Sequence, residues 1–69
     1  MLRRVAAHRV KTRDEELRMC IVEINDGIVT DYYTFSEEQP FTEWIGGTID
    51  IITDETGARF AVWQGERLF

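Results

Sequence analysis

The chain has few of the residues from which small proteins build cross-links or reactive centres. It contains one cysteine, one histidine and one proline among its 69 residues. A single cysteine excludes an internal disulfide, and one cysteine with one histidine cannot supply the four ligands of a structural zinc site. Gly46-Gly47 lacks the further glycines, the lysine and the following helix of a phosphate-binding loop. We therefore expect no metal and no cofactor.

Long apolar segments are also missing. No stretch approaches the roughly 20 apolar residues of a membrane span, and the charged start Met1-Leu2-Arg3-Arg4 is not followed by the apolar run of a signal peptide. A lone cysteine without an export signal is typical of a reducing compartment. These observations predict a cytoplasmic protein that does not contact membranes.

Basic residues are scarce beyond the first quarter of the chain. Residues 1–18 hold six basic and three acidic residues, whereas residues 19–69 hold two basic and ten acidic ones, for a total net charge of −5. A basic stripe for nucleic acid is one interpretation of this asymmetry, but an acidic domain repels phosphate at long range. We favour a basic first strand beside an acidic body, and no nucleic-acid partner.

The clearest local pattern lies at residues 19–35, where two apolar runs flank Asn25-Asp26-Gly27. Asn, Asp and Gly tolerate the backbone of tight turns, so the pattern predicts a β-hairpin. A three-residue loop would pair Ile24 with Ile28, and a two-residue loop would pair Ile24 with Val29.

The distribution of charge favours the three-residue loop. In that register one face is uncharged, and Glu23 and Asp31 lie together on the other face with Tyr33. The predicted core face then carries Cys20, Val22, Ile24, Ile28, Thr30 and Tyr32.

Further strands are predicted on both sides of this hairpin. Residues 3–12 alternate imperfectly, which suits an edge strand, although Arg and Ala also favour helices. Residues 48–53 and 58–63 are strand-like, and residues 67–69 form a short last strand after the turn at Gln64-Gly65-Glu66. Phe41 and Trp44, in the loop after the hairpin, are expected to plug one end of the core.

These segments predict an all-β fold in a single domain of residues 1–69. Five or six short strands would form an antiparallel meander, closed as a small barrel or a two-layer sandwich around the hairpin of residues 19–35. A chain of this size buries only about 60% of its unfolded surface and often depends on a partner for stability. We therefore expect a homo-oligomer or a protein partner.

Residues capable of chemistry are present but isolated. His8 and Cys20 could form a nucleophile pair only if neighbouring strands brought them together, and a buried Cys behaves as a small hydrophobe. Glu23 and Asp31, diagonally offset on adjacent strands, could do acid–base work only in a cleft. A solvated face explains both acids, so we expect no enzymatic activity and assign no catalytic residue.

Aromatic residues carry the strongest functional indication. Tyr32 and Tyr33 point to opposite faces of one strand, and Trp63 lies opposite Phe60, so some aromatic side chains must lie off the core. Exposed aromatics on small β-domains are effective interface anchors. We expect Tyr33, Trp44, Trp63 and Phe69 to contact a partner.

The segment Arg3–Tyr33, with Ile21-Val22-Glu23-Ile24-Asn25-Asp26-Gly27-Ile28-Val29 at its centre, resembles the small non-catalytic β-domain of amidohydrolase-type metal-dependent hydrolases. The catalysis of that family resides in a separate barrel with a His-x-His metal pair, which this chain lacks. The resemblance therefore implies a free-standing accessory β-domain without hydrolase activity. The small core, the surplus of aromatic residues and the absence of a catalytic site predict a non-catalytic interaction module. A small-ligand binder, or an accessory β-domain that serves a separate metal-dependent hydrolase, is the alternative.

Overall fold

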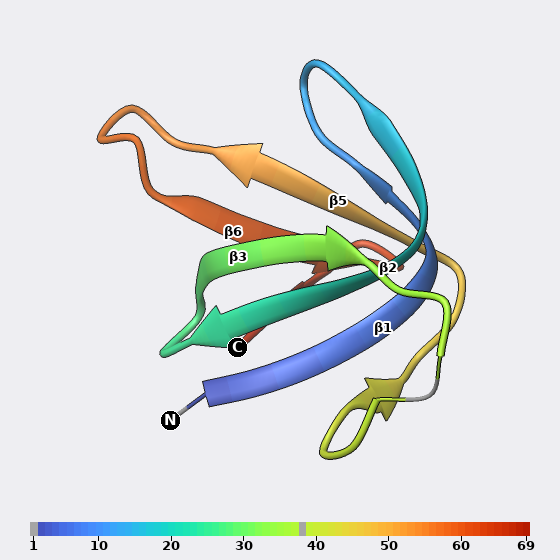
Figure 1. Cartoon of the computed structure of the whole chain (residues 1–69). Coiled ribbons are helices and arrows are strands. Elements are labelled where there is room, and N and C mark those ends of the chain that lie inside the picture. Colours follow the sequence, from blue (N-terminus) through green and yellow to red (C-terminus); the bar gives the residue numbers. More distant parts are fainter. Residues whose placement is uncertain (1, 38) are drawn as a thin grey trace.

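The computed structural model describes residues 2–37 and 39–69, which form a single curved sheet (Figure 1). Its strands are β1 (Leu2–Lys11), β2 (Glu16–Asn25), β3 (Ile28–Thr34), β4 (Glu43–Trp44), β5 (Thr48–Thr53), β6 (Arg59–Trp63) and β7 (Glu66–Leu68). No helix is present among the described residues. The all-β prediction is therefore confirmed, with one two-residue strand more than expected.

The sheet is mixed and open. Its order is β3-β2-β1-β5-β6-β7, and β4 also pairs with β1. The crossover after β3 returns the chain to the far edge of β1, so that β4 and β5 run parallel to β1. The strands therefore do not form a simple antiparallel meander, and their hydrogen bonding does not close a barrel.

The first strand lies at the centre of the sheet, so the prediction of an edge strand was wrong. β1 pairs with β2 on one side and with β4 and β5 on the other. Its imperfect alternation has a different cause. The β1–β2 ladder is interrupted at His8 and Met19, and Met19 has a φ of 53°. Before this interruption the odd-numbered residues Val5 and Ala7 face the core, and after it the even-numbered Val10 does. Ala7 and Val10 are therefore both buried.

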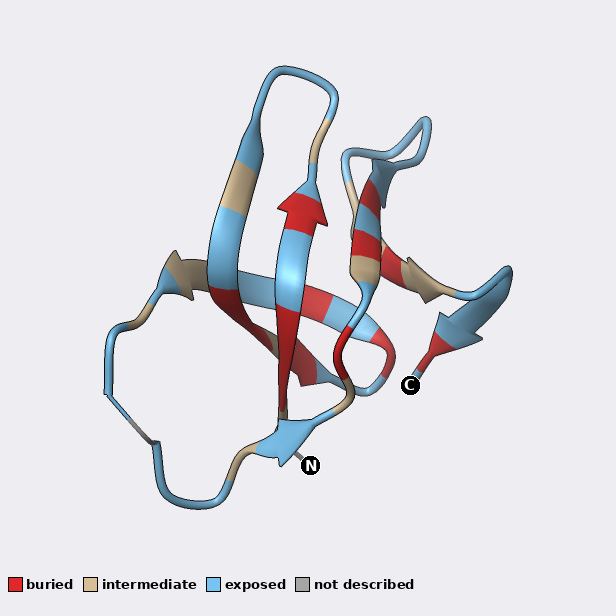
Figure 2. Cartoon of the chain, turned by 90° about the vertical axis from the view of Figure 1, so that its right-hand side faces the viewer, coloured by how far each residue is buried: buried red, intermediate tan, exposed pale blue. Residues whose placement is uncertain are grey.

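The core occupies the concave side of the curved sheet, as the buried positions in Figure 2 indicate. Cys20, Val22 and Ile24 are fully buried there, and Tyr32 packs against them, as predicted. From the other half of the sheet, β5 and β6 contribute Ile49, Ile51 and Ala61 to the same core. Leu68 of β7 is also buried there.

The hairpin turn differs from the favoured register. Asp26 and Gly27 have φ angles of 52° and 81°, the backbone of a two-residue type I′ turn. Ile24 consequently pairs with Val29, which is buried, whereas Ile28 and Thr30 are exposed and do not belong to the core.

A β-bulge explains why the charge argument was nevertheless correct for the outer face. The register shifts between Glu23 and Ile24, so that Glu23 pairs with Asp31 and Thr30 is left as the extra residue. The bulge moves the following residues by one position. Glu23 and Asp31 therefore share the outer face, and Tyr32 returns to the core side.

Candidate interaction surface

The four aromatic residues predicted to contact a partner lie in different environments. Trp63 packs against the core, and its Nε1 donates a hydrogen bond to the Gly46 carbonyl at 3.0 Å. Tyr33 is half-buried and donates its hydroxyl to Glu23 at 2.7 Å. Trp44 and Phe69 are exposed at 53% and 67%. Only these last two present most of their surface to solvent.

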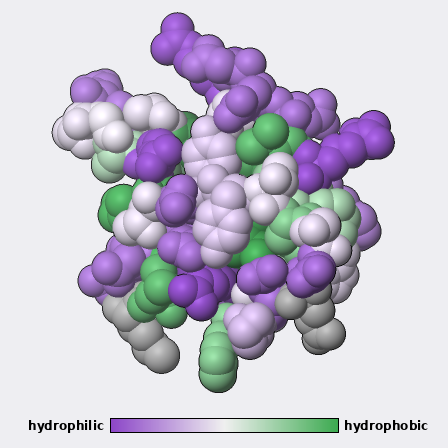
Figure 3. Space-filling view, viewed as in Figure 1, coloured by the Kyte–Doolittle hydropathy of each residue, from purple (hydrophilic) through white to green (hydrophobic). Residues whose placement is uncertain are grey.

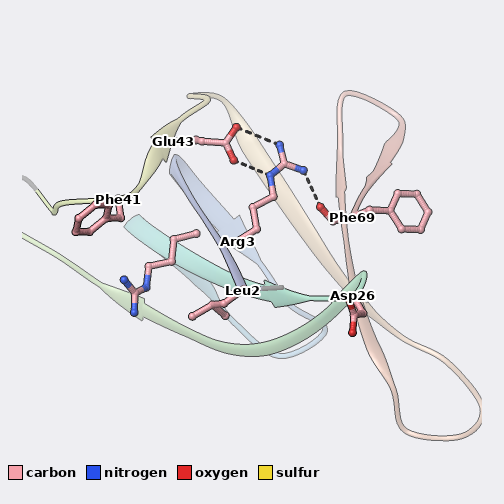
Figure 4. Close-up of a pocket in the computed structure, with 7 residues that line it drawn as sticks. Leu2, Arg3, Asp26, Phe41, Glu43 and Phe69 are labelled. Atoms are coloured by element: carbon pink, nitrogen blue, oxygen red, sulfur yellow. Dashed lines mark hydrogen bonds and ion pairs between the residues drawn. The ribbon is translucent and has the colours of Figure 1, made fainter.

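Three exposed apolar residues line one depression at the end of the sheet where the beginning of β1 meets the end of the chain; Phe41 and Phe69 lie on opposite sides of Arg3, and the Phe69 ring points away from Leu2 and Phe41 (Figure 4). Leu2, Phe41 and Phe69 line a groove of about 630 Å³ there. Phe41 is 93% exposed, so it does not plug the core as predicted. Its φ of 57° belongs to the left-handed region, and it lies in the turn just before the chain returns to the sheet at Glu43.

Arg3 lies between Phe41 and Phe69 in this groove (Figure 4). Its guanidinium donates to both carboxylate oxygens of Glu43, at 2.6 and 3.3 Å, and to the Phe69 carbonyl at 2.9 Å. The hydrogen bonds from Arg3 lower the pKa of the Glu43 carboxyl. β1, β4 and the residue after β7 are thereby tied together beneath the apolar side chains.

The charges around the groove balance one another. Its lining contains two arginines, Arg3 and Arg4, and two acids, Asp26 and Glu43. Arg4 is also paired with Glu23 at 3.0 Å. On the face seen in Figure 3, small groups of hydrophobic side chains lie between hydrophilic ones. The groove therefore combines apolar side chains with equal numbers of basic and acidic ones, on a protein that is acidic as a whole.

Beside this groove, the connection between β3 and β4 covers part of the outer face of the sheet. Ile21 lies on that face, opposite the core, yet is fully buried. The crossover between β3 and β4 passes over it and leaves a small cavity of about 130 Å³. The cavity is lined by Ala6, Ile21, Phe35, Gln39, Thr42 and Trp44. The exposed Trp44 ring thus borders a second apolar layer.

The two carboxylates considered for acid–base chemistry are directly opposite each other, not diagonally offset. Glu23 accepts hydrogen bonds from the Tyr33 hydroxyl and from Arg4 Nε, and these bonds lower its pKa. Asp31 accepts the backbone N–H of Tyr32 at 2.8 Å. A carboxylate held in its ionised form by two donors is poorly suited to donate a proton.

We expect the Glu23 network to make stability depend on pH. Because its folded-state pKa is lowered, ionised Glu23 stabilises the fold above the ordinary glutamate value of about 4.3. That contribution is lost as the pH falls through the lowered value. The difference in unfolding free energy between the wild type and Glu23→Gln should therefore shrink below about pH 4. Urea denaturation from pH 8 to pH 3 measures it, and a constant difference would contradict the network.

Cys20 and His8 do not form a nucleophile pair. Cys20 is buried in the core, and burial raises the pKa of its thiol, which keeps it protonated and unreactive. His8 is exposed, and its Nδ1 accepts the backbone N–H of Gly47 at 3.0 Å. Sequence reasoning could not have found this contact, because its two partners are 39 residues apart.

Sequence reasoning also missed Leu2 and gave Phe41 the wrong role, since no local pattern places the crossover beside the first strand. The described residues contain no group of three or more His, Cys, Asp or Glu side chains arranged to hold a metal. They also contain no helix that could cross a membrane. No protein-family model, curated protein or solved structure matches the chain.

Proposed function

We propose that this protein is a non-catalytic interaction module that self-associates through the groove lined by Leu2, Phe41 and Phe69. The proposal is carried by the fact that these three exposed apolar residues line a single groove. Apolar residues scattered singly over a surface are ordinary, whereas apolar residues that share a groove mark contact sites. Of the contact residues expected from the sequence, the proposal keeps Phe69 and Trp44. It adds Leu2 and Phe41, which line the groove.

Charge favours a second copy of the chain as the occupant. Two copies with a net charge of −5 repel each other, so contact is least unfavourable where the local charge is neutral. The groove supplies both signs, with Arg3 and Arg4 near Asp26 and Glu43. A two-fold contact places each patch against itself and therefore requires such self-complementarity.

The required area exceeds the groove itself. A stable interface buries about 800 Å² on each partner, a large share of the 4782 Å² surface of this chain. The contact would therefore extend from the groove over the neighbouring crossover and Trp44. An association confined to the three groove residues would be weak and transient.

We expect Phe41→Ser to weaken self-association about tenfold or more, because it removes an aromatic anchor from the centre of the contact. Its stability should change by no more than about 0.5 kcal/mol, since the side chain is almost fully exposed. Sedimentation velocity over a range of concentrations measures the association, and urea denaturation measures the stability.

Ile52→Ser is the matched control. Ile52 is an exposed apolar residue on β5, outside the groove. Its substitution should leave association unchanged. A wild-type chain that stays monomeric at millimolar concentration would refute self-association, and an equal effect of the two variants would show that the contact is not centred on the groove.

A further inference from the structure

A single histidine lies at the corner where the sheet bends. His8 occupies the interruption of the β1–β2 ladder and contacts the junction between β4 and β5. In this junction Trp44 is opposite Ala6, whereas Thr48 is opposite Arg9. The segment from Trp44 to Thr48 thus contains one residue more than the segment of β1 that it faces. The backbone accommodates the extra residue at Gly46 and Gly47, whose φ angles are 69° and 66°.

Most hydrogen bonds at the junction use groups that do not titrate. Ala6 O accepts the N–H groups of Ile45 and Gly46 at 3.0 and 3.3 Å, and Gly47 O accepts the Arg9 N–H at 3.1 Å. Gly46 O accepts the Trp63 indole N–H. The bond from Gly47 N–H to His8 Nδ1 at 3.0 Å differs, because its acceptor can take up a proton.

We propose that His8 is a pH-sensitive latch on the β4–β5 junction. To accept the Gly47 N–H, Nδ1 must present its lone pair, so neutral His8 carries its proton on Nε2. Protonation at Nδ1 converts this acceptor into a donor, and two N–H groups then face each other. The bond is lost, and it re-forms when the proton leaves.

The groups around His8 leave its ring open to solvent. The ring is exposed and shares a shallow depression with Arg9, Arg18 and Met19. Arg9 from β1 is paired with Glu16 at 3.6 Å, and Arg18 is the charged group that β2 contributes to the depression. From the β4 side, the uncharged Trp44 ring meets the imidazole edge-on, with 4.7 Å between ring centroids.

Loss of the bond acts on a segment that can move. Glycines adopt positive and negative φ with similar ease, and once the Gly47 N–H is released the Gly46-Gly47 peptide keeps, among the described residues, only the hydrogen bond from the Trp63 indole to the Gly46 carbonyl. The imidazolium can stay in contact with the Trp44 ring, because aromatic faces attract cations. Acidification should therefore loosen Gly47 while His8 and Trp44 remain together. The latch does not depend on the proposed self-association.

NMR of the wild-type protein tests the latch directly. The ¹⁵N signals of the His8 ring at pH 8 should show an unprotonated Nδ1 and a protonated Nε2. Between pH 8 and pH 5, where imidazoles change charge, the hydrogen-exchange protection of the Gly47 amide should fall about tenfold, the change expected for one ordinary hydrogen bond. The fall should coincide with the titration of the His8 ring.

Two controls separate the latch from general acid effects. The Gly57 amide donates to Asp54 O at 3.1 Å and should keep its protection, since the Thr56 hydrogen bonds lower the pKa of the Asp54 carboxyl and keep it ionised. In His8→Asn the side-chain Oδ1 can replace Nδ1 as an acceptor that does not titrate, so Gly47 should stay protected at pH 5. The latch is overturned if Nδ1 is protonated at pH 8, if Gly47 and Gly57 respond alike, or if His8→Asn shows the wild-type loss.

Discussion

Replacing Ile21 by alanine should cost about 2 to 4 kcal/mol of folding free energy, the usual range for a fully buried isoleucine. Ile21 is fully buried although it faces away from the main core. Its neighbours across the sheet are Ala6 and Tyr33. The crossover covers it from outside, so a truncated side chain would enlarge the cavity that already lies there.

Ile28→Ala provides the matched control. Ile28 belongs to the same hairpin, but its side chain is exposed. Its truncation should cost less than about 1 kcal/mol. Urea denaturation followed by far-UV circular dichroism gives both values. If Ile21→Ala costs no more than Ile28→Ala, the crossover does not form a second apolar layer over the sheet.

The two isoleucines also show how far the sequence could predict this fold. The Asn-Asp-Gly turn and the flanking apolar runs located the hairpin, because turn chemistry and period-two patterning act over a few residues. The loop type was decided by charge separation, and that argument assumed an unbroken ladder. Because a bulge at Thr30 separates the charges equally well, the observed two-residue turn was compatible with the same outer face.

Long-range pairing was beyond local reasoning. Val5, Ala6 and Ala7 are all buried, which is the pattern of a strand covered on both faces. Their sequence alone could not distinguish that from weak alternation on an edge strand. The crossover that brings β4 and β5 beside β1 contains no local signal of its destination, so the parallel pairing and the exposure of Phe41 could not be predicted.

The four aromatic residues expected to contact a partner differ in their exposure, and local sequence could not show which of them would be covered. Aromatic composition pointed to association, and Trp44 and Phe69 are exposed. Trp63 packs against the core and bonds Gly46, whereas Tyr33 lies half-buried on the outer face and bonds Glu23. The resemblance to an accessory β-domain, the cytoplasmic location and the absence of enzymatic activity stay predictions.

The open sheet is held together at its ends by arginine side chains. β3 lies against β6, although no backbone ladder joins them. Arg67 of β7 donates to the Gly27 carbonyl in the β2–β3 turn at 3.1 Å. Its guanidinium also lies over the rings of Phe60 and Phe69, 4.7 and 4.8 Å from their centroids. This contact connects the last strand to the hairpin on the opposite edge of the sheet.

Arg67→Ala should therefore destabilise the protein by about 2.5 kcal/mol. The hydrogen bond of a charged donor contributes about 1.5 kcal/mol or more, and each exposed cation–π contact about 0.5 kcal/mol. Arg67→Lys should lose less stability, because it keeps the positive charge. It should still lose some, because lysine lacks the planar group that stacks on the rings. Arg13→Ala removes an exposed loop arginine and should change stability by less than about 0.5 kcal/mol.

Gly27→Ala tests the same contact from the other side. The turn holds Gly27 at a φ of +81°, and an added Cβ would lie 2.8 Å from Phe69 Cδ1 and 3.3 Å from Arg67 Nη2. The new methyl group must therefore displace the Arg67 and Phe69 side chains, in addition to the backbone strain of about 1 kcal/mol. Part of the cost of Gly27→Ala is then the loss of the Arg67 contact itself.

The double variant decides whether this contact closes the fold. If Arg67 and Gly27 act together, Gly27→Ala with Arg67→Ala should cost less than the two single substitutions added, by about 0.5 kcal/mol or more. Equilibrium unfolding in urea of the wild type, the two single variants and the double variant gives the coupling. Additive effects would mean that Arg67 and Gly27 contribute to the unfolding free energy independently. The core between β1, β2, β5 and β6 would then hold the two edges of the sheet together without the Arg67 contact.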